Sequence, residues 1–187
     1  ILGLNINFKN GLFSCALLMG CMLPLNAAAN EKAVTLSAGG GAGAGAAAGV
    51  FMVEYEHALT NSLSVAGRGA YLAYTYDSGD DYEEDGSGPG AQVSVKFYPG
   101  HEALHGFYFG GGLGMWSMDV DWTEDKGYIY ETKGSLTTTS ADVHAEVGWR
   151  IGKRVQFVPS VQLGHFLSSE IDLGAYLSVN LGIGFAF

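Results

Sequence analysis

The sequence has few of the residues on which several protein classes depend. Its two cysteines, Cys15 and Cys21, both lie in the first thirty residues, so the rest of the chain offers no disulfide and no thiolate ligand. Nine Lys and Arg stand against nineteen Asp and Glu, a net charge of −10. This balance excludes a nucleic-acid partner, because phosphate backbones are bound by clustered basic side chains. Four prolines, and 29 glycines without a triplet repeat, exclude a collagen-like chain.

The N-terminal part has the features of an export signal. Lys9 is followed by an apolar stretch of signal-peptide length, and Ala27-Ala28-Ala29 supplies the small residues at which a signal peptidase cuts. We therefore expect 1–29 to be a signal peptide and 30–187 to form one domain, a barrel. An alternative is processing as a lipoprotein, because Leu18-Met19-Gly20-Cys21 loosely resembles a lipobox, in which the cysteine is acylated.

Alternation of apolar and polar residues with a period of two dominates the chain after residue 30, where no apolar run approaches the length of a membrane-spanning helix. In the last segment every second residue is apolar: Leu173, Ala175, Leu177, Val179, Leu181, Ile183, Phe185 and Phe187. Six earlier segments repeat this parity, near residues 51–56, 63–74, 92–98, 107–115, 141–150 and 155–164. They predict seven β-strands, and an eighth is predicted from Val34–Ala38 and the Gly/Ala-rich residues 39–49. A flexible linker is the alternative for that Gly/Ala run.

The connections between these segments alternate in length. Those after the second, fourth and sixth strands are short, at 60–62, 99–106 and 152–154, whereas those after the third and fifth are long and acidic. Outer-membrane barrels have short periplasmic turns and long outer loops, and an even strand number puts both termini in the periplasm. The sequence thus predicts an all-β fold, an eight-stranded antiparallel up-and-down transmembrane β-barrel.

The ionisable residues of the strands share the polar face. They are Glu54, Glu56, Arg68, Lys96, Asp142, His144, Glu146 and Arg150. Aromatic residues gather on the apolar face near the short turns, as in the girdles at a membrane boundary. We therefore predict that the apolar face contacts lipid and that these eight residues form a polar network in a narrow lumen, where opposite charges neutralise one another. A soluble barrel with the faces reversed is the alternative.

The C-terminal octet resembles the assembly signal of outer-membrane proteins, which has a polar residue, a glycine, an aromatic residue and a terminal aromatic residue at fixed spacing. Asn180, Gly182, Phe185 and Phe187 occupy these positions. The resemblance implies recognition by the barrel-assembly machinery. In strand number and length the chain is similar to small eight-stranded outer-membrane barrels such as the OmpA transmembrane domain and OmpX. This resemblance implies that the protein resides in the outer membrane of a Gram-negative-type bacterium, in contact with lipid and lipopolysaccharide.

Two groups of residues match catalytic patterns. His101-Glu102-Ala103-Leu104-His105 fits the H-E-x-x-H motif of zinc proteases, but flanking Pro and Gly residues leave room for barely one helical turn. We interpret it as a solvated periplasmic turn without metal. His165 with Ser168, Ser169 and Glu170 resembles the His, Ser and Glu of lipid A deacylase barrels. The spacing differs, because that family places its serine two residues after the histidine, where this chain has Leu167.

The segment Asp77–Gly88 carries six acidic residues that could gather Ca²⁺ or Mg²⁺, but it lacks the ligand spacing of an EF-hand. We interpret it as a solvated outer loop that meets an unknown extracellular partner or the divalent ions that bridge lipopolysaccharide. The sequence therefore favours a non-enzymatic outer-membrane barrel without cofactor, with an envelope or surface-interaction role. The alternative is a lipid-modifying enzyme.

Overall fold

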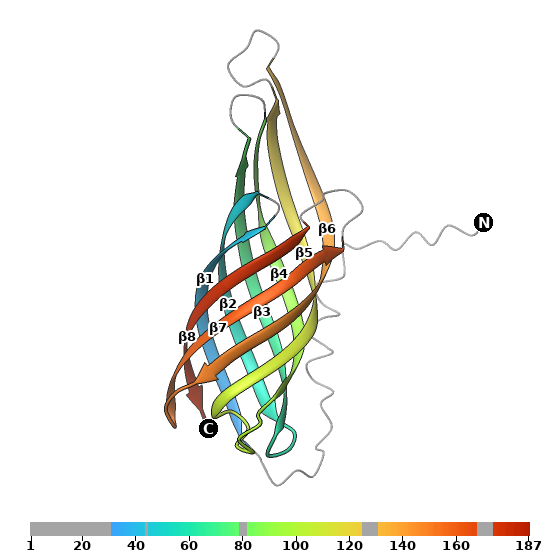
Figure 1. The fold of residues 1–187 in the computed structure, drawn as a ribbon. Coiled ribbons are helices and arrows are strands. Elements are labelled where there is room, and N and C mark those ends of the chain that lie inside the picture. The colour runs from blue at the N-terminus through green and yellow to red at the C-terminus, as the bar shows by residue number, and fades with distance from the viewer. Residues whose placement is uncertain (1–30, 44, 79–81, 125–130, 168–173) are drawn as a thin grey trace, which may run out of the picture.

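The computed structural model describes residues 31–43, 45–78, 82–124, 131–167 and 174–187, which form a closed antiparallel barrel (Figure 1). Its strands are β1 (Lys32–Gly43), β2 (Ala46–Ala58), β3 (Leu63–Asp77), β4 (Tyr82–Phe97), β5 (Gly106–Glu124), β6 (Thr132–Arg150), β7 (Val155–Leu167) and β8 (Ala175–Ala186). Each strand pairs with the next along the chain, and β8 pairs with β1. The predicted fold class is confirmed. The predicted signal peptide, 1–29, lies outside the described residues.

The Gly/Ala-rich run is part of the barrel wall. It forms the outer ends of β1 and β2, and Gly45, at φ 87°, lies in the turn between them. At the β1–β8 seam a Cβ on Gly41 would collide with the carbonyl oxygen of Leu177. Small residues therefore let the first and last strands approach closely, and the interpretation of this run as a strand and hairpin is confirmed over that of a linker.

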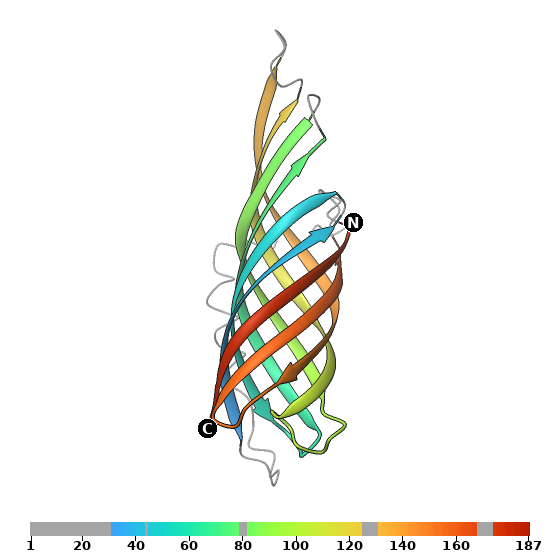
Figure 2. The ribbon, with the colours of Figure 1, turned by 60° about the vertical axis from the view of Figure 1, so that its left-hand side comes forward.

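The two ends of the barrel differ. One end carries the connections β2–β3, β4–β5 and β6–β7 together with the C-terminus, and the other is slanted, because β3 to β6 reach far beyond the remaining strands (Figures 1 and 2). β6 pairs with β5 as far as Thr132, but with β7 only from Ala141 onward. The outer ends of β3 to β6 thus form a protruding four-stranded sheet, which we call the protruding sheet.

The acidic segment 77–88, which was predicted to be a solvated loop, lies at the top of this sheet and is largely β-strand. Asp77 ends β3 and residues 83–88 belong to β4, so most of the expected loop is paired strand. Residues 83 to 87 pair with β3 on one side and with β5 on the other. A ladder on both sides satisfies the backbone of this segment, which explains why residues of low β-propensity remain extended. Residues 79–81 lie outside the described part of the chain.

The predicted distribution of the two faces is confirmed. Large apolar side chains point outward all around the barrel, for example Leu113, Val143, Leu163 and Ile183, while the eight residues predicted for the polar network are buried inside. Outward aromatic residues gather toward the end with the short turns: Tyr55, Phe107, Phe109, Trp149, Phe157, Phe185 and Phe187. No helix in the described part of the chain is long and apolar enough to cross a membrane.

Candidate functional site

Six ionised side chains converge in the lumen, on the side of the barrel centre that faces the short turns. All six residues have even sequence numbers, point inward and are at most 5% exposed. They are Glu54 and Glu56 of β2, Arg68 of β3, Lys96 of β4, and Glu146 and Arg150 of β6. We call this group the lumen cluster. Four strands contribute to it, so it ties the barrel wall together across its interior.

Glu54 is the centre of the lumen cluster. Its carboxylate accepts hydrogen bonds from Arg68 Nε at 2.5 Å, Lys96 Nζ at 2.8 Å and Arg150 Nη2 at 2.8 Å. Lys96 also donates to Glu56 at 3.0 Å. An isolated charge in such a buried position would be very costly, and the cations offset that cost only because each has carboxylate partners.

Glu56 and Glu146 complete the lumen cluster. Glu56 pairs with Arg150 and accepts a hydrogen bond from Tyr98 Oη at 2.6 Å, and Glu146 pairs with Arg68. Three carboxylates therefore face three cations, and the lumen cluster is neutral as a whole. The structure brings together six of the eight residues predicted for the polar network.

The other two predicted residues, Asp142 and His144, form a separate group toward the outer end. Asp142 accepts hydrogen bonds from His144 Nδ1 at 3.0 Å, Trp116 Nε1 at 3.1 Å, Tyr176 Oη at 2.8 Å and Gln92 Nε2 at 3.4 Å. The carboxylate is thus held by four donors rather than by a buried Lys or Arg. Nothing in the sequence pattern separates Asp142 from the lumen cluster, because the separation depends on the height of each residue in the barrel.

Beside the Asp142 group, the outer half of the lumen contains an apolar cluster that was not predicted from the sequence. Tyr74, Trp116, Met118 and Val120 form a buried cluster, against which Val50, Leu72, Phe166 and several alanines pack: Ala46, Ala48 and Ala70. These side chains occupy inward positions of their strands. The alternation along β5 could have predicted this apolar cluster. If Leu113 and Met115 point outward, then Trp116, Met118 and Val120 must point inward.

The segment 101–105, which matches the zinc-protease motif, closes the inner end of the barrel. It is not helical: His101 and Leu104 have φ of 58° and 67°. Ala103 and Leu104 are buried against the ends of the strands, and His101 Nδ1 contacts Ser62 Oγ at 2.7 Å. The segment is therefore not simply the solvated turn that was expected, because its apolar pair packs into the barrel. Within the described ranges no group of three or more His, Cys, Asp or Glu could hold a metal ion.

Of the four deacylase-like residues, His165 lies in the described part of the chain. His165 lies on the outward, lipid-facing side of β7, opposite Val143 and Ala175. Ser168, Ser169 and Glu170 lie outside the described residues. This position of His165 gives it no charged or polar neighbour across either ladder.

The residues of the C-terminal octet divide between the two faces of β8. Asn180 is buried in the lumen and donates to Ser178 Oγ at 3.2 Å, and Gly182 lies against Thr35 of β1. Phe185 and Phe187 point outward. The backbone of Phe187 exchanges two hydrogen bonds with Lys32, at 2.8 and 2.9 Å, so the last residue closes the seam with β1.

The chain matches no protein-family model and no curated protein. Among solved structures it is similar to the attachment invasion locus protein Ail of Yersinia pestis, with 14% identity and a TM-score of 0.59 over 85% of this chain and 99% of Ail. The complex of Ail with the heparin analogue sucrose octasulfate gives 15% identity and a TM-score of 0.57 over the same shares. A major outer-membrane protein from Thermus thermophilus gives 12% identity, a TM-score of 0.53, and shares of 83% and 99%. With its closed barrel and its outward apolar surface, the chain has the fold of the small eight-stranded outer-membrane β-barrels and resides in the bacterial outer membrane.

Proposed function

We propose that the protein is a non-enzymatic outer-membrane barrel that is closed to ions and that presents the acidic outer face of its protruding sheet to a basic partner outside the cell. The observation that carries the first part is the lumen cluster, in which six buried ionised side chains neutralise one another across the interior. An eight-stranded barrel has an interior just wide enough for side chains to fill. The buried pair Ala103 and Leu104 adds a second closure at the inner end.

The closed lumen is tested by conductance across a planar lipid bilayer. We expect the wild-type protein to show no steady current, because an ion that enters the lumen meets paired charges and finds no continuous water path. Replacing one cation and one anion of the lumen cluster, Lys96→Ala with Glu56→Ala, keeps the net charge and removes bulk, and we expect it to produce open-channel events. A steady current through the folded wild-type barrel would refute the proposal.

A neutral pair on the surface provides the matched control for this experiment. Lys133 Nζ lies 2.7 Å from Glu131 Oε1, near the tip of the protruding sheet and far from the lumen cluster. Lys133→Ala with Glu131→Ala removes the same two charges, and we expect its current to equal that of the wild type. Equal currents for this control and the lumen variant would show that the lumen cluster is not the group that closes the barrel.

The protruding sheet supports the second part of the proposal. Its outer face carries Asp85, Asp119 and Asp121, which line one surface hollow together with Thr75, Ser87 and several alanine and glycine residues. Thr75 donates to Asp85 at 2.7 Å and Thr137 donates to Asp119 at 2.7 Å, so the carboxylates are held in place on the strands. Ail has been seen with a heparin analogue, which is strongly anionic. An acidic face repels such a ligand, so for this chain we favour a partner with a basic surface.

Tyrosines on the inner face of the protruding sheet add to its rigidity. Tyr82 Oη donates to Glu84 at 2.5 Å, and Tyr74 Oη donates to the other oxygen of Glu84 at 2.6 Å. Partial burial and the hydrogen bond to Glu84 raise the pKa of Tyr82 to about 12. The hydroxyl is therefore a donor throughout the physiological pH range, and the sheet can present its acidic face in one conformation.

The basic-partner proposal is tested with polylysine beads and proteoliposomes. We expect the wild-type barrel to bind polylysine and not polyglutamate, and binding should weaken with rising salt. Asp119→Asn with Asp121→Asn should reduce binding several-fold. The control is Asp142→Asn, which removes one acidic charge from inside the barrel and leaves the outer face unchanged. Binding that is unaffected by the surface pair would contradict this assignment.

The C-terminal octet supports recognition by the barrel-assembly machinery, since Asn180, Gly182, Phe185 and Phe187 keep the spacing of the assembly signal. Phe185 and Phe187 point outward from β8, so their rings are accessible to an assembly factor. No specific observation favours lipid modification, because His165 faces lipid rather than a polar pocket.

A further inference from the structure

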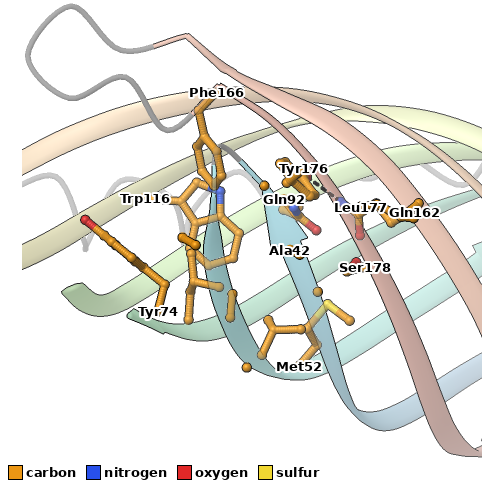
Figure 3. Close-up of a pocket in the computed structure, with 17 residues that line it drawn as sticks. Ala42, Met52, Tyr74, Gln92, Trp116, Gln162, Phe166, Tyr176, Leu177 and Ser178 are labelled. Atoms are coloured by element: carbon orange, nitrogen blue, oxygen red, sulfur yellow. Dashed lines mark hydrogen bonds between the residues drawn. The ribbon is translucent and has the colours of Figure 1, made fainter. Parts of the chain in front are cut away.

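A cavity lies beside the apolar cluster in the outer half of the lumen. Its volume is about 70 Å³, and Figure 3 shows Trp116 and Phe166 beside each other in its wall. Met52, Leu72 and Ala48 also belong to the apolar lining, and none of the described residues that line the cavity is charged. Gly43 and Ala46, which flank the β1–β2 turn, also line the cavity, so it reaches the outer rim of the barrel.

The lining contains one buried polar atom without a partner among the described residues. Gln92 is 3% exposed, and its Oε1 accepts no hydrogen bond. The orientation of its amide is set by Asp142, since a carboxylate can only accept and must face the Nε2 group, at 3.4 Å. The other polar side chains of this wall are satisfied, because Gln162 donates to Tyr176 at 2.8 Å and Tyr176 donates to Asp142. A buried acceptor without a donor is costly, and a bound molecule with a donor would remove that cost.

We propose that this cavity is a binding site for a small neutral molecule with a compact apolar body and one hydroxyl group, which donates to Gln92 Oε1. At roughly 10–15 Å³ for each water-sized group, the cavity of about 70 Å³ holds about five to seven non-hydrogen atoms. A charged molecule would lose its hydration without gaining a counter-ion on this wall. An apolar body gains from leaving water, and the hydroxyl satisfies the one open acceptor.

The experiment uses Trp116 as a reporter in the cavity wall. In a protein with Trp122→Phe and Trp149→Phe it is the sole tryptophan, and bromine quenches tryptophan fluorescence on contact. The probes are 3-bromopropan-1-ol and 1-bromopropane, which share the apolar body and differ in the hydroxyl group. In lipid vesicles we expect saturable quenching by the alcohol, with an affinity several-fold above that for the bromoalkane.

Two variants separate the cavity from partition of the probes into lipid. Ala48→Leu fills the cavity and should weaken binding of the alcohol at least about tenfold, while Ala47→Leu, on the outward side of the same strand, should leave it unchanged. Ala48→Val serves the same purpose if the leucine variant does not fold, as judged by heat-modifiable gel migration. Gln92→Met should reduce binding of the alcohol about fivefold and leave the bromoalkane unaffected.

Two results would overturn the inference. Quenching that rises linearly and equally in the Ala48 and Ala47 variants would show lipid partition without a site. Equal affinity for the two probes, in the wild-type background and in Gln92→Met, would show that Gln92 does not recognise a hydroxyl group.

Discussion

Replacement of Arg150 by methionine is expected to lower the free energy of unfolding by about 3–5 kcal/mol, because it removes one of the cations that neutralise the buried carboxylates Glu54 and Glu56. Arg150 is 2% exposed and donates to Glu54 at 2.8 Å, to Gln156 at 3.0 Å and to Thr35 at 3.1 Å, and it also pairs with Glu56. Methionine keeps much of the apolar stem but none of these donors. The lumen cluster changes from neutral to a net charge of −1.

Urea unfolding in lipid vesicles, followed by tryptophan fluorescence and by gel migration without boiling, measures this effect. Lys133→Met is the matched control on the same strand, since Lys133 is 69% exposed and surface pairs contribute little. A second comparison adds Glu56→Gln to Arg150→Met, which removes one anion and should recover part of the lost stability. If Arg150→Met unfolds at the same urea concentration as Lys133→Met, the lumen cluster does not stabilise the barrel.

The strand number and the orientation of the two faces could be predicted because both depend on local alternation. Once the parity of β8 is fixed by residues such as Leu181 and Ile183, every side chain of the strand is assigned to lipid or lumen. The outward residues are exposed and the inward ones buried. The same rule predicted the positions of all eight residues of the polar network, although not their grouping.

The grouping could not be predicted because it depends on the register between distant strands. Glu54 lies opposite Arg68 on the β2–β3 ladder, and Lys96 lies opposite Ser64 on the next one. A shift of two residues in any ladder would keep every side chain on its face and yet change the ion pairs. Asp142 and His144 share the parity of Glu146 on β6, and only their greater height separates them from the lumen cluster.

The length of the protruding sheet was missed for a compositional reason. Acidic residues and glycine have low β-propensity and are common in loops, so the segment from Asp77 to Gly88 has the composition of a loop. Its neighbours override that preference: Tyr74 and Tyr76 of β3 lie opposite Gly86 and Glu84. Tyr76 also packs edge-on against Tyr82 at 6.0 Å between ring centroids. Cross-strand contacts of this kind stabilise a sheet beyond the membrane.

Val143→Arg is expected to destabilise the barrel in a lipid bilayer by about 2–4 kcal/mol, the cost of a cation on the lipid face near the midplane. Val143 is 43% exposed on the outer surface and lies opposite Leu113 of β5 and His165 of β7. Its neighbours along β6, Asp142 and His144, point into the lumen. The substitution therefore tests which face contacts hydrocarbon without disturbing the polar interior.

Thr137→Arg is the matched control, because Thr137 is on the same outward face of the same strand but within the protruding sheet. Six residues of strand place it roughly 20 Å farther along β6, where Thr137 already donates to Asp119 in an aqueous setting. We expect an unchanged urea midpoint for this variant, and a clear loss for Val143→Arg in vesicles. A soluble barrel would tolerate arginine equally well at both exposed positions, so equal midpoints would place Val143 in water and contradict a lipid-facing outer surface.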